Sequence, residues 1–139
     1  MATFNKFNSF VEAVAEKVHN LGSDVITVAL CAAANAPVAG NTVLANLTQA
    51  SYTNCSSRVV TTTSSAQTSG TYKLVLTDLT LTASGGTVGP FRYVVLYNDT
   101  ATNKELIGWY DYGPFDITLA SGETLLIDFD GTNGVLTLA

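Results

Sequence analysis

The side chains that could perform chemistry are few and lie far apart in the sequence. His19 is the only histidine, and we expect it at a solvent-facing helix position rather than in a catalytic triad or a metal site. Cys31 and Cys55 are too few for a disulfide framework and too far apart for a CxxC metal motif. They are interpreted as small, partly buried thiols, and a bond between them stays open. The sequence therefore predicts no catalytic residue, no metal ligand and no cofactor, and we expect a protein that is not an enzyme.

The acidic residues are concentrated in the last part of the chain. Residues 99–139 hold seven acidic residues and one lysine, a net charge of −6, whereas residues 1–98 carry +1. Within the acidic part, residues 128–134 superficially resemble a calcium-binding loop. An EF-hand needs glycine at its sixth position and glutamate at its twelfth, where this chain has Asn133 and Ala139. The segment is therefore predicted to be an Asp/Asn/Gly turn, and electrostatic docking should involve the acidic end.

Aromatic residues form the most interaction-like feature of the sequence. Trp109, Tyr110 and Tyr112 are close neighbours in the chain, and tryptophan and tyrosine are enriched at the centres of protein interfaces. Phe4 and Phe7 lie at the start of a predicted helix, where an aromatic ring could pack under the domain or dock on a neighbour. These five residues are the candidate interface residues. The competing interpretation places Trp109 in the core and Tyr110 on the outside.

The composition excludes several classes of protein. Of the 139 residues, 47% are hydrophobic and only 12% are charged, which excludes a disordered chain. Lysine and arginine together number six and the net charge is −5, so the basic patch that nucleic-acid binding requires is missing. Threonine, serine and asparagine replace the charged residues, and this favours a surface that contacts other protein.

Neither a membrane nor a secretion pathway is predicted. No apolar run approaches the ~20 residues of a membrane-spanning helix. The first residues lack the basic start and the apolar stretch of a signal peptide. We therefore expect a protein made in a cytoplasm, with no membrane partner.

One amphipathic helix is predicted near the N-terminus, over residues 5–21. Apolar residues recur there at helical spacing and form one stripe. They are Phe7, Phe10, Val11, Val14, Val18 and Leu21. Gly22 follows as a natural C-terminal stop.

The remaining residues, 24–139, are predicted to form a β-domain. Apolar runs separated by glycine, asparagine and serine favour strands within residues 25–30, 58–63, 72–76, 79–83, 91–97, 106–110, 115–119, 125–129 and 136–138. The segment 91–97 is apolar at nearly every position, which predicts a strand covered on both faces. We expect one domain over residues 1–139. It should be mainly β, an antiparallel β-sandwich or closed barrel of about seven strands with one N-terminal α-helix.

Five stretches of the chain carry a resemblance to a known family. They are residues 4–7, 35–44, 70–76, 82–99 and 106–112. The most specific of them is Gly89 to Asp99, which contains the sequence Gly-Pro-Phe-Arg-Tyr-Val-Val-Leu-Tyr-Asn-Asp. In these stretches the chain resembles a family of small structural virion proteins of tailed bacteriophages. The resemblance covers most of the chain.

The resemblance implies a non-enzymatic component of a phage particle. The function that we expect is that of a decoration, or cement, protein that binds the outer surface of the head and bridges major capsid subunits. Its partners would be the major capsid protein and further copies of itself, as a homotrimer or another homo-oligomer. It would be made in the host bacterial cytoplasm and would act on the capsid surface. Two alternatives stay open: a head–tail or tail protein such as a tail-tube or terminator subunit, and a module that binds host-surface glycans.

Overall fold

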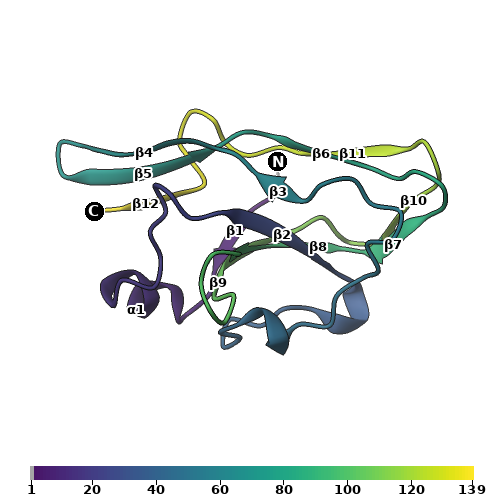
Figure 1. Ribbon diagram of the computed structural model, residues 1–139, viewed down its shortest axis with the longest axis horizontal. Coiled ribbons are helices and arrows are strands. Elements are labelled where there is room, and N and C mark those ends of the chain that lie inside the picture. The colour runs from purple at the N-terminus through teal and green to yellow at the C-terminus, as the bar shows by residue number, and fades with distance from the viewer. Residues whose placement is uncertain (1) are drawn as a thin grey trace.

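The computed structural model describes residues 2–139, and its largest element is a five-stranded antiparallel sheet (Figure 1). The order of its strands is β1-β9-β8-β2-β3. Their bounds are Phe4–Lys6 for β1, Leu106–Asp111 for β9, Tyr93–Asn98 for β8, Ile26–Cys31 for β2 and Val59–Val60 for β3. The central pair, β2 and β8, is the longest ladder in this sheet, running from Ile26 opposite Asn98 to Cys31 opposite Tyr93.

Three smaller antiparallel sheets complete the β structure of the described residues. One has the order β12-β5-β4, with bounds Leu136–Leu138, Thr71–Leu76 and Thr62–Thr68. The second pairs β11, Thr124–Ile127, with β6, Leu79–Thr82. The third pairs β10, Ile117–Leu119, with β7, Val88–Phe91. In Figure 1 the strands β4, β5, β6 and β11 lie above the large sheet, and β7 and β10 lie at its right-hand end.

The prediction of a mainly β, antiparallel chain is confirmed, but that of a closed barrel is wrong. The large sheet is open, because β1 and β3 are edge strands with one neighbour each. The described residues form twelve strands rather than about seven. Part of the difference arises because a predicted segment is divided. The strand expected over residues 91–97, for example, is interrupted at Arg92, so that Phe91 belongs to β7 and the rest to β8, in two different sheets.

The central strands are buried on both faces, as predicted for residues 91–97. One face contributes Val28, Val94 and Leu96 to the main core, which the upper layer covers with Leu74, Leu81, Ile127 and other side chains. The opposite face contributes Ala29 and Val95 to a smaller cluster. Leu44 and Leu47 pack against that cluster, in the segment that contains the short 3₁₀ turns Ala33–Asn35 and Leu44–Asn46. This burial fixes the large sheet as the rigid base of the molecule.

The helix is much shorter than predicted. It spans Phe10–Ala15 instead of residues 5–21, and residues 4–6 form β1, which pairs with the edge of β9. Lys17 ends the helix because it adopts a φ of +66°. Its N–H donates to the Val14 carbonyl at 3.2 Å and the Val18 N–H donates to the Ala13 carbonyl at 2.8 Å, which is a Schellman motif. A lysine in this conformation carries no sequence signal, so the apolar stripe suggested a helix that continues to residue 21.

The hairpin of β4 and β5 projects beyond the large sheet, above α1 (Figure 1). Its strand β4 is an edge strand, and none of its seven residues is buried. Over residues 2–139 the structure contains no helix of the length and apolarity that a membrane span needs.

Candidate functional site

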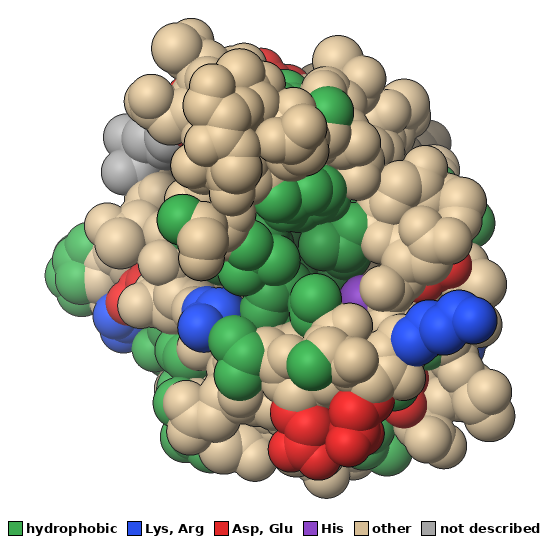
Figure 2. Space-filling view, turned by 90° about the vertical axis from the view of Figure 1, so that its left-hand side faces the viewer, with side chains coloured by type: hydrophobic (Ala, Val, Ile, Leu, Met, Phe, Trp, Pro, Cys, Tyr) green, Lys and Arg blue, Asp and Glu red, His purple; other side chains and the backbone are tan. Residues whose placement is uncertain are grey.

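A hollow of about 620 Å³ lies between α1 and the underside of the projecting hairpin. Figure 2 looks into it and shows hydrophobic side chains at its centre with a histidine at its wall. The apolar residues that line it come from the end of α1, the turn after it and the strands above: Val14, Val18, Leu21, Tyr72 and Leu138. The hollow is therefore lined by segments from the two ends of the chain and by the hairpin.

The hollow exists because two apolar surfaces diverge. The inner face of β5 begins with buried Leu74 and continues outward to half-buried Tyr72, which packs against the edge of the main core. Below it, Val18 follows the end of α1 and lines the hollow. The Tyr72 hydroxyl is 2.8 Å from the Ser65 hydroxyl across the hairpin, so its ring is held in place over the hollow.

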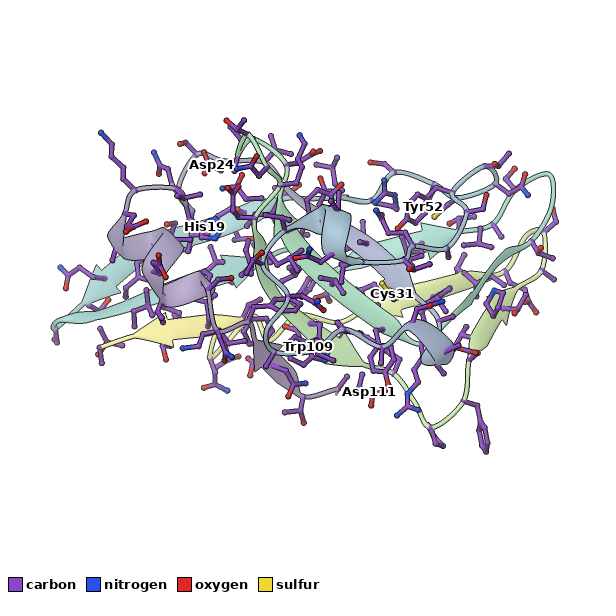
Figure 3. All side chains as sticks on the ribbon, turned by 90° about the horizontal axis from the view of Figure 1, so that it is seen from below. His19, Asp24, Cys31, Tyr52, Trp109 and Asp111 are labelled. Atoms are coloured by element: carbon purple, nitrogen blue, oxygen red, sulfur yellow. The ribbon has the colours of Figure 1, made fainter. Side chains whose placement is uncertain are left out.

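A polar network borders the hollow. The Asn98 side chain is fully buried, and its Nδ2 donates to Asp24 Oδ2 at 2.6 Å and lies 3.1 Å from His19 Nδ1. Its Oδ1 accepts from the N–H groups of Thr100 and Ala101, both at 3.0 Å. These two bonds fix the orientation of the amide. Figure 3 shows His19 and Asp24 close together beside α1.

The network opposes protonation of His19. Because Asn98 Nδ2 is a donor, His19 Nδ1 must accept, and a proton on that nitrogen would set donor against donor. Burial lowers the pKa of His19 from its ordinary value of 6.5, and the nearby charges of Glu105 and Asp24 oppose this effect only in part. His19 is 7% exposed and lies outside α1. The prediction of a solvent-facing helix position is therefore wrong, because the helix ends before this residue.

The five candidate interface residues lie in the edge strand β1 and its neighbour β9 or directly after them. Phe7 is fully buried and packs on Trp109 with ring centroids 4.6 Å apart. Phe4 packs on Tyr110 at 5.4 Å. Phe4, Trp109 and Tyr112 are half-buried, so only these three present any surface to a partner.

The interpretation that placed Trp109 in the core and Tyr110 outside is wrong. Tyr110 is 3% exposed and faces the main core, 5.9 Å from the Phe129 ring. Trp109 is half-buried and packs against the smaller cluster on the other face. Neighbouring residues of a strand face opposite sides of a sheet, and the aromatic run itself does not indicate which face carries the larger core.

The most exposed aromatic side chain among the described residues was not among the candidates. Phe115 is 80% exposed. The alternation of Phe115, Ile117 and Leu119 suggested a strand with all three on one face. The strand β10 begins only at Ile117, and the Gly113-Pro114 pair before Phe115 was the signal that it lies in a turn.

Hydrogen bonds hold this turn on both sides of Phe115. Arg92 Nη1 donates to the Pro114 carbonyl at 3.2 Å, and the guanidinium also binds Asp111 in a bidentate pair at 2.6 and 2.7 Å. On the other side, the Ala33 N–H donates to Asp116 Oδ1 at 2.8 Å. The Phe115 ring is thus presented to solvent on a fixed support.

The cysteines and the acidic turn take ordinary structural positions. Cys31 and Cys55 are both free thiols, and burial raises the pKa of Cys31 to about 11. The segment 128–134 forms the predicted turn, in which Asp130 Oδ1 accepts from the N–H groups of Thr132 and Asn133 at 2.9 and 2.7 Å. Within residues 2–139, no three His, Cys, Asp or Glu side chains are grouped in a way that could hold a metal ion.

The molecule therefore has two features suited to contact with another molecule. The hollow can take up an apolar group, and its histidine already has its Nδ1 engaged by Asn98. The Phe115 turn can supply an apolar group. Comparisons of the chain with protein-family models, with curated proteins and with solved structures gave no match.

Proposed function

We propose that the protein is a non-enzymatic structural component of a tailed-phage virion, a decoration protein that binds the outer surface of the head. The observation that carries this proposal is the pair of apolar contact features, an open hollow and an exposed phenylalanine, on a chain with 12% charged residues. Such features bind protein surfaces. The resemblance of residues 89–99 and the other stretches to small virion proteins supplies the setting. We also propose that the large sheet and the smaller sheets are the two layers of a single β-sandwich domain.

A decoration role fits the physics of weak, repeated contacts. Each copy would bind the major capsid protein and neighbouring copies of itself, as a trimer or another oligomer. Many such contacts act together, because each bound copy raises the effective concentration of the next contact. Binding only to the assembled shell stabilises that shell relative to its separated subunits.

The location of the protein in virions tests the proposal. A small tag at the C-terminus, labelled with gold or antibody, should decorate heads over their whole surface in electron micrographs. The copy number per virion should be of the same order as that of the major capsid protein. Label confined to the tail, or absent from purified virions, would reject the decoration role.

One observation favours the head–tail or tail alternative. Tail-tube subunits form rings and extend an arm to the next ring, and the β4–β5 hairpin projects from this molecule as an arm would (Figure 1). The same labelling experiment separates the two roles, because a tube subunit would appear along the tail. The glycan-binding alternative has less support, since Tyr110 is buried and Trp109 is half-buried in the chain.

A further inference from the structure

We propose that Phe115 of one copy inserts into the hollow of a second copy, so that the protein associates with itself head to tail. This inference deepens the proposed function and rests on it in one respect, since an assembly role is what makes self-association useful. The hollow and Phe115 lie at opposite ends of the molecule, the hollow beneath the projecting hairpin and Phe115 beside β10 (Figure 1).

Phe115 has the properties of an anchor residue. It is 80% exposed, whereas the other large exposed hydrophobic residues of the described chain are 44% to 58% exposed. Phe115 therefore has the largest fraction of its surface available for burial in a contact. Its support is already ordered, because Pro114 and Asp116 on either side are held by Arg92 and by the Ala33 N–H. A side chain on a fixed support costs little conformational entropy when it binds. Aromatic anchors in fitted pockets dominate the energetics of many interfaces.

The hollow has the size that a phenyl ring needs, and part of its lining is apolar. Its volume is about 620 Å³, and an apolar cavity of roughly 150 Å³ is enough to bind benzene. The hollow therefore admits the Phe115 ring together with backbone of its turn. Val18, Tyr72 and Leu138 would contact the ring from below and above.

One pair of opposite charges can meet across this contact. Lys17 is exposed at the rim of the hollow, and no salt bridge within residues 2–139 engages it. Asp116 is exposed and directly follows Phe115. An Asp116–Lys17 pair across the contact would orient the inserted turn, and it would add mainly specificity.

The geometry of this contact makes the association repeatable. The hollow opens at one end of the molecule (Figure 2), so the copy that inserts its Phe115 keeps its own hollow free. A head-to-tail contact of this kind closes into a ring or continues as a chain of subunits. A ring of copies is the arrangement that would place a decoration protein around a symmetry axis of a shell.

Sedimentation velocity over a concentration series tests the inference with three variants of the full chain. Phe115→Ser removes the anchor from an exposed turn. Leu138→Asp places a carboxylate in the hollow at the last but one residue, where it would also repel Asp116. Val38→Ser is the matched control, because Val38 is 58% exposed and lies in neither feature. Circular dichroism and thermal unfolding check that each variant is folded.

The expected result is self-association of the wild-type chain and of Val38→Ser. Phe115→Ser and Leu138→Asp should each associate at least about tenfold more weakly. An equimolar mixture of these two variants should recover a dimer, because one supplies an intact hollow and the other an intact Phe115. If Leu138→Asp is not folded, Val18→Trp, which fills the hollow, takes its place in the mixture.

Wild-type association that Phe115→Ser leaves unchanged would overturn the inference, as would a wild-type chain that stays monomeric at its highest soluble concentration. A mixture that fails to form the dimer would do the same. These outcomes are separate from the test of the proposed function. If the protein covers phage heads but its self-association is unchanged by Phe115→Ser, only the inference is refuted. If it associates through Phe115 but is absent from virions, only the proposed function is refuted.

Discussion

The β2–β8 pair and the β4–β5 hairpin are both antiparallel ladders of similar length, yet they differ in almost every other respect. All six residues of β2 and five of the six of β8 are buried, whereas no residue of β4 is buried. Backbone hydrogen bonds are common to both pairs, so the difference lies in what covers the side chains. The central pair lies within the core, whereas β4 is left free to contact another molecule, although the inner half of β5 contributes Leu74 and Leu76 to the main core.

The largest effect is expected in the central pair. Leu96 is fully buried between the layers, and Leu96→Ala should lower the free energy of unfolding by about 2 to 5 kcal/mol, because it removes buried contacts and leaves a cavity. The matched control is Leu126→Ala on β11, where the side chain is 53% exposed and the change should cost less than about 1 kcal/mol. Urea denaturation of both variants measures the two losses. Equal losses of unfolding free energy would show that the burial of a side chain does not determine its contribution to stability in these two layers.

The same contrast explains which parts of the fold are predictable from sequence. Residues 26–30 and 93–97 form strands as expected, because strands buried on both faces need an almost continuous run of apolar residues. Residues 62–68 form a strand too, although the polar composition of 64–70 favours a loop. Threonine, serine and glutamine fill this strand because neither of its faces is buried, so the alternation that marks a half-buried strand is missing.

The candidate site was predictable only in part. The apolar residues Val18 and Leu21 belong to the helical stripe of the sequence, but the helix stops at Ala15. Nothing in the order of the residues indicates that the hairpin covers them, since Tyr72 lies about fifty positions further along the chain. The network around Asn98 gives no sequence signal for the same reason. Its partners His19 and Asp24 are distant in sequence, and asparagine after a strand usually marks a turn.

The second largest effect is expected at the edge of the large sheet. A Cβ atom at Gly108 would lie 2.2 Å from Cζ of Phe4 and 2.6 Å from the Asn5 carbonyl oxygen. Gly108→Ala should therefore push β1 away from β9 and cost roughly 1 to 3 kcal/mol. Gly40→Ala is the control, because a Cβ atom there would meet nothing within 4 Å and the backbone is not strained. Thermal unfolding compares the two variants. An unchanged midpoint for Gly108→Ala would show that β1 can move away from β9 without a loss of stability.

A smaller, pH-dependent effect is expected beside the hollow. The pKa of His19 is lower in the folded chain than its ordinary 6.5, so the unfolded chain binds this proton more readily as the pH falls. Stability from this group is complete above pH 6.5 and is lost as the pH drops through the folded pKa. The midpoint of urea unfolding should thus decline below pH 6.5 in wild type, and His19→Gln should flatten that decline.

Two carboxylates titrate in a lower pH range than His19, and this separates their effect on stability from that of His19. The Arg92 guanidinium lowers the pKa of Asp111 below 3.8, and Lys104 does the same for Asp99. Their contribution is lost only in stronger acid, as the pH falls through these lowered pKa values. A His19→Gln variant that keeps the full decline just below pH 6.5 would show that another group titrates there.

The smallest effect is expected in the hairpin itself. Tyr72→Phe removes the 2.8 Å hydrogen bond to Ser65 but keeps the ring over the hollow. The cost should be about 0.5 to 1.5 kcal/mol at most, because the bond is only partly buried and water can replace it. Amide hydrogen exchange should show faster exchange in β4 and β5 and unchanged protection in β2 and β8. Faster exchange in both regions would mean that the hairpin and the central pair unfold as one unit, and the contrast between them would then describe only the burial of side chains.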